Sequence, residues 1–276
     1  MPRPVLMGVV NVTPDSFSDG GRYVDSDVAV AHGRRLLAEG ADIVDVGGES
    51  TRPGATRPLV AEELNRVIPV ITALAADGAV VSVDTMRAEV AQAAIEAGAR
   101  MVNDVSGGLA DPAILDVVAG SGASYVAMHW RGHADRMQTM ATYDEPGGVV
   151  AAVVRELSER VDAARAAGIP DDRLILDPGL GFAKTADHNW ALVAATARLQ
   201  ALGFPLLVGG SRKSFLGSLL AAPDGSPRPV DDRESASTAL TLLLAQLGVW
   251  GIRVHDVRAS ADALAVLDRL AREETS

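Results

Sequence analysis

Cysteine is absent from this chain of 276 residues, and long apolar runs are absent as well. Without thiols the chain forms neither a disulfide nor a thiolate metal site, so any metal must be bound through oxygen or nitrogen. No stretch approaches the length of about 18 apolar residues that a membrane-spanning helix requires. The first apolar run, residues 5–10, is too short for a secretory signal peptide, and we therefore expect a cytoplasmic protein.

Positive charge is scarce in this sequence. The chain has 25 lysine and arginine residues against 36 aspartate and glutamate residues, which gives a formal net charge of -11. Such a charge repels the phosphates of nucleic acids and of anionic membranes, so we expect no partner of either kind. An anionic substrate would need a cationic site of its own.

Apolar runs of strand length recur along the chain, and most follow a helical pattern that stops at a glycine. Glycine is a common helix end because it adopts the left-handed conformation without strain. Eight strands are predicted, at residues 5–10, 42–46, 79–83, 101–102, 125–128, 174–176, 206–208 and 251–254. Continuous apolar strands that alternate with helices are typical of a parallel sheet covered on both faces.

Eight such units predict an α/β fold, a single (β/α)8 TIM barrel that spans residues 1–276. The alternative is a doubly wound open sheet, but the G-x-G-x-x-G motif of that fold is missing after the first strand. Two longer loops are expected at 130–148 and 221–232, and neither shows a shift in composition that would mark a second domain.

Polar residues follow every predicted strand. In a TIM barrel the active site is built at the carboxyl ends of the strands, so these residues are the candidate site residues. They are Asn11, residues 49–52, Asp84, Asn103 with Asp104, His129, Asp177, residues 211–213, and Arg253 with His255. All eight strands thus deliver polar or charged groups to one rim.

The cations of this rim suit an anion. Arg253 and His255 alternate along a strand, so their side chains project to the same side and can bind one phosphate group. Lys213 follows the neighbouring strand, and Lys184 is the one other lysine of the sequence. An ion pair between Arg253 and Asp256 is the alternative for the arginine. For Lys184 a solvated surface charge is equally expected.

Three polar residues, Asp84, Asn103 and Asp177, end strands that face one another across the mouth of the predicted barrel. Carboxylate and amide groups together match a heterocycle that presents adjacent N–H and NH₂ donors and ring acceptors. Helix capping by Asp84 and turn formation by Asp177 are the alternatives. For His129 and Asp45 we favour structural roles, with Asp45 bound to other inward-pointing polar residues.

Seven motifs follow one another from the first predicted strand to the last. They are NVTPDSFSDGG at 11–21, DVGGESTRPGA at 45–55, SVDT at 82–85, NDVSGG at 103–108, DPGLGFAKT at 177–185, GSRK at 210–213 and RVHD at 253–256. Together they resemble the dihydropteroate synthase family of pterin-binding barrels. That family joins 6-hydroxymethyl-7,8-dihydropterin pyrophosphate to 4-aminobenzoate, which yields 7,8-dihydropteroate and pyrophosphate in folate synthesis. The resemblance implies a transferase.

The resemblance also implies roles for residues at the matched positions. The pterin ring would be held by Asp84, Asn103, Asp177 and Lys213, in a pocket lined by Val105, Met128, Phe182 and Gly209. The pyrophosphate group would be bound by Asn11, Arg253 and His255, with Asn11 also ligating Mg²⁺. The 4-aminobenzoate site and its loops would be formed by Thr51, Arg52, Pro53, Phe17, Ser211 and Asp19. The catalytic groups would be Lys213, Arg253 and His255.

By the same resemblance the cofactor is Mg²⁺, the protein is a homodimer, and sulfonamides compete with 4-aminobenzoate. The helix expected at 235–247 or the last helix would carry the dimer contact. An aromatic amine is largely unprotonated at neutral pH, so its attack needs no general base. The step that needs catalysis is the departure of pyrophosphate, which develops charge on the leaving oxygen.

Two other functions are compatible with a pterin-binding barrel. A folate-dependent methyltransferase, which passes a methyl group to a corrinoid protein, needs no pyrophosphate site, and the set Lys213, Arg253 and His255 argues against it. A non-catalytic pterin-binding paralogue would have lost site residues such as Asn11 and Arg52, which this chain keeps. The segment 132–145 carries no motif that assigns it a role.

Overall fold

A computed structural model describes residues 3–12, 22–49, 57–133 and 137–274. Its eight parallel strands form one sheet in the order β6-β5-β4-β3-β2-β1-β8-β7. They are β1 Val5–Asn11, β2 Ile43–Gly47, β3 Val81–Asp84, β4 Met101–Asp104, β5 Ser124–Met128, β6 Leu174–Asp177, β7 Leu207–Val208 and β8 Gly251–Val254. A parallel bridge between Leu176 and Leu206 joins the two ends of this order and closes the barrel. The predicted (β/α)8 fold is therefore confirmed.

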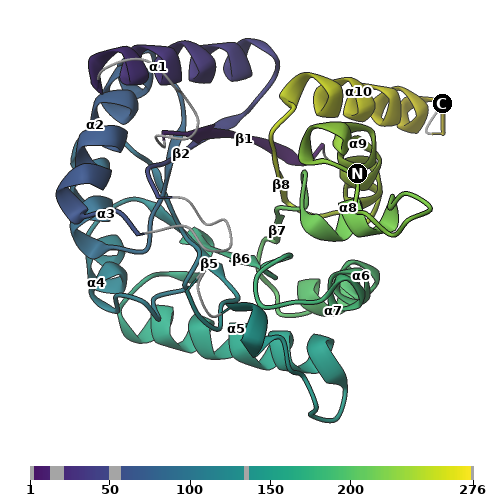
Figure 1. Ribbon diagram of the computed structural model, residues 1–276. Helices are drawn as coiled ribbons and strands as arrows, with labels where there is room; N and C mark the ends of the chain where they lie inside the picture. Colours follow the sequence, from purple (N-terminus) through teal and green to yellow (C-terminus); the bar gives the residue numbers. More distant parts are fainter. Residues whose placement is uncertain (1–2, 13–21, 50–56, 134–136, 275–276) are drawn as a thin grey trace.

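Helices form the outer ring around the strands (Figure 1). The α-helices are α1 Arg22–Ala38, α2 Val60–Ala76, α3 Ala88–Glu96, α4 Ala113–Ala119, α5 Gly148–Ala166, α6 Ala186–Ala194, α7 Thr196–Gln200, α8 Ser214–Leu219, α9 Glu234–Gln246 and α10 Val257–Glu274. The described residues also form short 3₁₀ turns, which are η2 Met137–Met140, η3 Asp171–Arg173 and η4 Val230–Asp232. Within the described chain, no helix combines the length and the apolar character that crossing a membrane requires.

The glycine stops of the sequence act as expected at the helix ends. After α2, Gly78 has a φ of 84°. Its N–H donates to the carbonyl of Ala75 over 2.9 Å, and the N–H of Ala79 donates to that of Leu74 over 3.1 Å. A side chain at this φ would be strained, so glycine allows the chain to leave the helix and enter the next strand.

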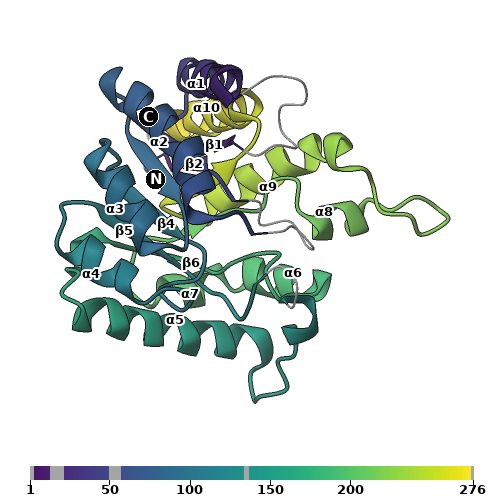
Figure 2. The same cartoon turned by 60° about the vertical axis from the view of Figure 1, so that its left-hand side comes forward.

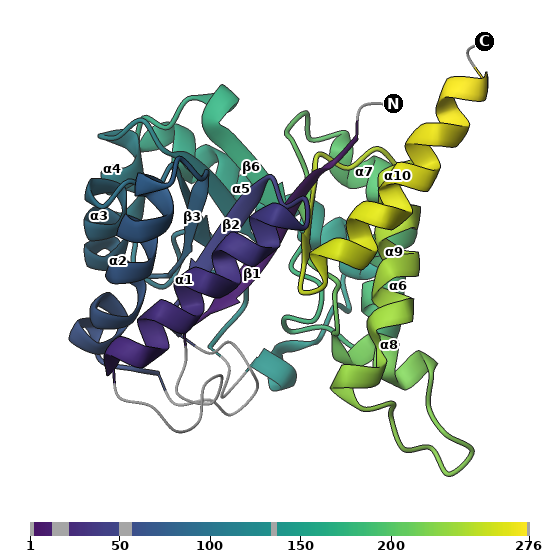
Figure 3. The ribbon, with the colours of Figure 1, turned by 90° about the horizontal axis from the view of Figure 1, so that it is seen from above.

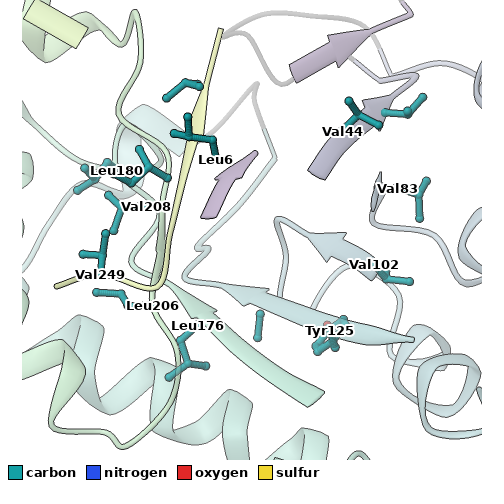
Figure 4. Close-up of a cluster of buried hydrophobic side chains, with 14 of the residues drawn as sticks. Leu6, Val44, Val83, Val102, Tyr125, Leu176, Leu180, Leu206, Val208 and Val249 are labelled. Carbon is teal, nitrogen blue, oxygen red and sulfur yellow. The ribbon is translucent and has the colours of Figure 1, made fainter. Parts of the chain in front are cut away.

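Successive residues of each strand face opposite sides of the sheet, and the two sides have separate apolar clusters. The outward-facing side chains pack beneath the helices in one large cluster, which includes Val44, Val83 and Val102 from three successive strands (Figure 4). The inward-facing side chains fill the barrel itself, and they are Met7, Ile43, Met101, Val126, Ile175 and Leu207. The barrel interior is thus a packed core.

The next inward-facing position of each strand lies two residues further along, closer to the carboxyl end. There the apolar plug gives way to a different layer, made of Asp45, Asn103, Met128, Asp177 and Gly209. These residues follow Ile43, Met101, Val126, Ile175 and Leu207 of the plug, whereas Met7 is followed by the apolar Val9. Strand periodicity therefore positions polar side chains on an apolar floor at one end of the barrel.

One of the two predicted long loops projects from the barrel. It connects α8 to η4, and two views show it standing away from the helix ring (Figures 2 and 3). The other, between β5 and α5, is described except for residues 134–136. It packs Tyr143 into the protein, where the residue is only 8% exposed.

Candidate active site

Arg253 is the centre of a buried cluster of polar side chains at the carboxyl ends of the strands. Its Nε donates to Oδ2 of Asp45 over 2.7 Å, and its Nη2 donates to Oδ2 of Asp84 over 2.8 Å. The same Oδ2 of Asp45 accepts from Nδ2 of Asn103 over 2.9 Å. The side chain of Asp45 is fully buried, and that of Arg253 is 22% exposed. The cluster joins four strands, β8, β2, β3 and β4.

This arrangement decides between the alternatives that the sequence left open for Arg253 and Asp84. Arg253 pairs with Asp45 and Asp84, whereas Asp256 accepts from the N–H of Ala259 in the first turn of α10. The predicted alternatives of an Arg253–Asp256 pair and of helix capping by Asp84 are therefore wrong. The structural role favoured for Asp45, binding to other inward-pointing polar residues, is confirmed.

The protonation of Asp84 responds to this burial. Burial raises the pKa of Asp84 to about 7, and the Arg253 guanidinium acts against that shift. A charged carboxylate is costly to remove from water, so it needs its cationic partner to stay ionised. Near neutral pH the Asp84 carboxyl is close to half ionised.

Lys213 approaches the cluster from the loop that follows β7. Its Nζ donates to the carbonyl of Leu180 and lies 4.7 Å from the ring centroid of Phe182. Gly209 lies beside both cations, because a Cβ placed there would be 3.9 Å from Nζ of Lys213 and 3.7 Å from Cβ of Arg253. Burial lowers the pKa of Lys213 to about 8, and the charge of Asp177 opposes the shift.

Asp177 ends β6 and is 6% exposed. Its Oδ1 accepts from the N–H of Gly179 over 2.7 Å, so the turn predicted for this residue is present. Burial raises the pKa of Asp177, and the charge of Lys213 opposes that effect. Asp177 thus forms the turn and also contributes charge to the rim.

An apolar patch borders these charges. It contains three residues predicted for the pocket lining, Val105, Met128 and Phe182, together with Met86, Trp130 and Ala110. Sequence reasoning missed Met86 and Trp130. Both directly follow polar residues at strand ends, so extending the candidate list by two residues past each strand would have found them.

His255 and Ser211 lie together at the ends of β8 and β7. Nδ1 of His255 is 3.0 Å from the hydroxyl of Ser211, and the His255 N–H also donates to that hydroxyl over 3.3 Å. Asn11 ends β1 and pairs in register with Gly47, which in turn pairs with Asp84. The structure therefore brings Ser211 to His255 and places Asn11 on the same rim.

His129 and Lys184 belong to a separate network of buried hydrogen bonds. Nζ of Lys184 is 2.9 Å from Nδ1 of His129, and Nε2 of His129 is 2.9 Å from Oε2 of Glu156. The structural role favoured for His129 is therefore confirmed. The surface-charge interpretation of Lys184 is wrong, because the residue is only 4% exposed.

Five predicted site residues lie outside the part of the chain that the structure describes. They are Phe17, Asp19, Thr51, Arg52 and Pro53. The described site therefore consists of the acid and amide residues, the cations and the apolar patch.

A site of this kind on a TIM barrel matches a known family. The model of the pterin binding enzyme family matches residues 7–255. A dihydropteroate synthase of Mycobacterium leprae is 56% identical over 264 residues, which cover 95% of this chain and 92% of the relative. The chain belongs to the pterin-binding enzymes.

Solved structures narrow this assignment. The Xanthomonas albilineans dihydropteroate synthase with 4-aminobenzoic acid has a TM-score of 0.88 at 48% identity, covering 98% of this chain and 93% of that one. The Yersinia pestis dihydropteroate synthase, in a sulfonamide drug complex, has a TM-score of 0.88 at 40% identity, covering 98% and 95%. Within the pterin-binding enzymes, the chain belongs to the dihydropteroate synthase family.

The burial of Asp45 and its bonds to two partners predict that replacing it lowers stability. Asp45→Leu removes the partner of both Arg253 and Asn103, and we expect a loss of about 3–5 kcal/mol in the free energy of unfolding. Asp45→Asn keeps an acceptor and should lose less, about 1–3 kcal/mol. Urea denaturation measures both values.

The control for this measurement is Asp77→Asn. It breaks an ion pair with Arg34 in which the side chains are 40% and 58% exposed. An exposed pair contributes about 0–1 kcal/mol, so the control should stay near the wild type. A stability of Asp45→Leu equal to that of the control would contradict the interpretation of the cluster.

Proposed function

We propose that this chain catalyses the dihydropteroate synthase reaction. The C–O bond between the pterin methylene and pyrophosphate breaks, the amine nitrogen of 4-aminobenzoate bonds to that methylene carbon, and the amine loses a proton. The observation that carries the proposal is the juxtaposition of buried acids with the cations Arg253 and Lys213 on one rim. The acids can accept hydrogen bonds from the N–H and NH₂ groups of a pterin, and the cations can stabilise the negative charge of the pyrophosphate leaving group.

The pterin would lie between the polar cluster and the apolar patch. Asp84 and Asp177 would accept hydrogen bonds from the ring N–H and NH₂ groups, and Asn103 can both donate and accept. The Phe182 side of the apolar patch would contact the ring face. The two carboxylates would also favour the positive charge that develops on the pterin when the leaving group departs.

The departing pyrophosphate would be stabilised by Arg253, His255 and Lys213. Two N–H groups of Arg253 are already engaged by Asp45 and Asp84, which fixes the guanidinium plane and leaves Nη1 for a phosphate oxygen. Ser211 orients the His255 ring through Nδ1. Departure precedes attack in this proposal, because the free amine needs no base.

Mg²⁺ is the cofactor that we propose, with Asn11 as its protein ligand. An amide oxygen suits Mg²⁺, which usually keeps several waters and binds to few protein groups together with substrate phosphates. A Cβ on Gly47 would lie 3.3 Å from Cβ of Asp84, so glycine leaves room between Asn11 and Asp84. Among the described residues no group of three or more acids and histidines gathers to cage a metal, which suits such a lightly held ion. When bound, Mg²⁺ would neutralise charge on pyrophosphate.

The 4-aminobenzoate site is proposed from the two motifs that follow β1 and β2. Phe17, Asp19, Thr51, Arg52 and Pro53 would complete it next to Ser211. We propose ordered binding, in which the pterin substrate binds first and the amine second. The sulfonamide complex of the Yersinia pestis relative supports sulfonamides as competitors at this site.

The methyltransferase and the non-catalytic paralogue are weaker proposals. A methyltransferase does not need Arg253 held rigidly beside Asp84 and Lys213. A paralogue without activity does not need to keep these groups buried at a cost in stability. The relatives at high identity over almost the whole chain are dihydropteroate synthases, which also favours the synthase.

Turnover with both substrates tests the proposed function. Wild-type protein with Mg²⁺ should form 7,8-dihydropteroate and pyrophosphate when both substrates are present, and removal of Mg²⁺ should abolish formation of 7,8-dihydropteroate. Lys213→Met should keep the fold and lower kcat by roughly 10²–10³, because one charge-stabilising group is lost. Arg34→Met, at a side chain that is 58% exposed, is the control and should keep wild-type turnover. Failure to form 7,8-dihydropteroate from the two substrates, or full activity of Lys213→Met, would refute the assignment.

The pKa values of Asp84 and Lys213 predict a narrow pH optimum. The active form has Asp84 ionised and Lys213 protonated. Below about 7 Asp84 gains a proton, and above about 8 Lys213 loses one, so kcat/KM should fall on both sides. Asp84→Asn should be slow and should lack the acidic limb. A wild-type profile that is flat from pH 6 to 9 would rule out these assignments.

We also propose a homodimer through α9 and α10, which pack on each other. Leu243 and Leu247 on α9 are 50% and 43% exposed, and Val266 and Leu270 on α10 are 70% and 56% exposed. Each pair has the spacing that places both side chains on one helix face. Sedimentation should give a dimer for the wild type and a monomer for the double variant Val266→Asp and Leu270→Asp. A monomeric wild type would end this proposal.

A further inference from the structure

Lys184, His129 and Glu156 form a buried chain of hydrogen bonds that the proposed reaction does not use. His129 is 1% exposed and Lys184 is 4% exposed, and the two contacts that join the three side chains are both 2.9 Å long. The chain runs from α5, through the end of β5, to the segment between β6 and α6. It lies beside the pterin pocket.

The protonation states of the three groups determine which atom donates in each hydrogen bond of the Lys184–His129–Glu156 chain. Burial lowers the pKa of His129 to about 4, so the ring is neutral at neutral pH. Burial alone would raise the pKa of Glu156, but hydrogen bonds from His129 and Arg131 hold it well below its usual value. The ionised carboxylate accepts only, so Nε2 of His129 carries the proton and Nδ1 accepts from Lys184. One arrangement satisfies all three groups.

The segment held by Lys184 has an unusual backbone. Gly179, Gly181 and Ala183 have φ values of 66°, 82° and 49°. For the two glycines this conformation is unstrained, but for alanine it is uncommon and strained. Ala183 therefore stays in this conformation only because its surroundings hold it there.

The peptide groups before and after Ala183 are each bound by a hydrogen bond from a side chain. Nζ of Lys184 donates to the carbonyl of Phe182 over 2.9 Å, and the hydroxyl of Tyr143 donates to the carbonyl of Ala183 over 2.9 Å. Tyr143 belongs to the same network, because the guanidinium of Arg131 lies 4.0 Å from its ring centroid. Nε of Arg131 donates to Glu156 over 3.0 Å. The segment 132–145, which carries no motif, supplies Tyr143.

The same segment supplies one wall of the pterin pocket. The Phe182 ring lies in the apolar patch, and the carbonyl of Leu180 accepts from Nζ of Lys213. A change in the path of residues 179–184 would move both the ring and the lysine that rests against it. Arg253 is held by Asp45 and Asp84, and His255 by Ser211, so neither contacts residues 179–184 through these bonds.

We propose that the Lys184–His129–Glu156 chain, with Tyr143, positions the Phe182 wall of the pocket and thereby sets the affinity for the pterin ring. This inference rests on the proposed function. Lys184 is a positioning residue in it, which acts through Phe182 and Lys213. Two of the three cations proposed for pyrophosphate, Arg253 and His255, have partners outside this segment, so the affinity for the pterin ring should respond more strongly than the affinity for pyrophosphate to changes in the Lys184–His129–Glu156 chain.

Calorimetry with two separate probes, pterin-6-carboxylate and inorganic pyrophosphate, tests the inference on the full chain. Lys184→Met removes both hydrogen bonds of Nζ at similar side-chain length. We expect the Kd of the pterin probe to rise about tenfold or more and the Kd of pyrophosphate to change by less than about twofold. Tyr143→Phe removes one hydroxyl and should weaken pterin binding in the same selective way, by a smaller factor.

Thermal unfolding separates positioning from a general role in folding. Lys184→Met removes the donor to His129 and Phe182 but keeps the length of the side chain, so its Tm should fall modestly and the protein should stay folded at the temperature of the calorimetry. Arg165→Met is the control: its partner Asp171 lies just before β6 at the opposite end of the barrel, and both affinities should be unchanged.

Three outcomes would overturn the inference. The first is wild-type pterin affinity in both Lys184→Met and Tyr143→Phe. The second is an equal loss of affinity for the pterin probe and for pyrophosphate. The third is a loss of pterin affinity that disappears when binding is measured well below the Tm of the variant. Wild-type protein that binds pyrophosphate but no pterin would instead defeat the proposed function itself.

Discussion

The buried ion pair of Arg253 with Asp45 is the interaction on which the site depends. Asp45 is fully buried and pairs with Arg253 over 2.7 Å, and burying a carboxylate is costly unless a cation and hydrogen bonds accompany it. Arg253 reaches it across 208 residues of sequence and takes Asp84 as a second partner, while Asn103 binds the same oxygen. A single carboxylate thus sets the relative placement of the groups proposed to bind the pterin and the arginine proposed to bind pyrophosphate.

Burial brings the pKa values of an acid and a base on this rim close together. It raises the pKa of the acid Asp84 to about 7 and lowers the pKa of the base Lys213 to about 8. In water the two groups would titrate more than six units apart, at about 3.9 and about 10.4. Near neutral pH both groups are close to the midpoints of their titrations. A pocket with two such groups can gain or lose a proton when a ligand binds, at little cost in free energy. This property belongs to the closed barrel mouth, and neither residue has it alone.

The strands and the rim could be predicted from the sequence because they depend on local pattern. Apolar runs, seven of them after glycine stops, located all eight strands, and the position after each run located Asp84, Asn103 and Asp177. Pairings between distant residues have no such local signal. The sequence offered Asp256 as the neighbour of Arg253, whereas the true partners come from β2 and β3. Lys184 likewise finds His129 across 55 residues, which only the closed fold reveals.

The barrel has one weak seam. Five residue pairs join β1 to β2, whereas a single bridge, Leu176 with Leu206, joins β6 to β7. Backbone amides exchange with solvent fastest where few hydrogen bonds must open together, so exchange should begin at this seam. The seam lies between Asp177 and Gly209, directly below the pocket wall that Phe182 and Lys213 form. The least cooperative part of the sheet therefore lies beneath one wall of the proposed pterin pocket.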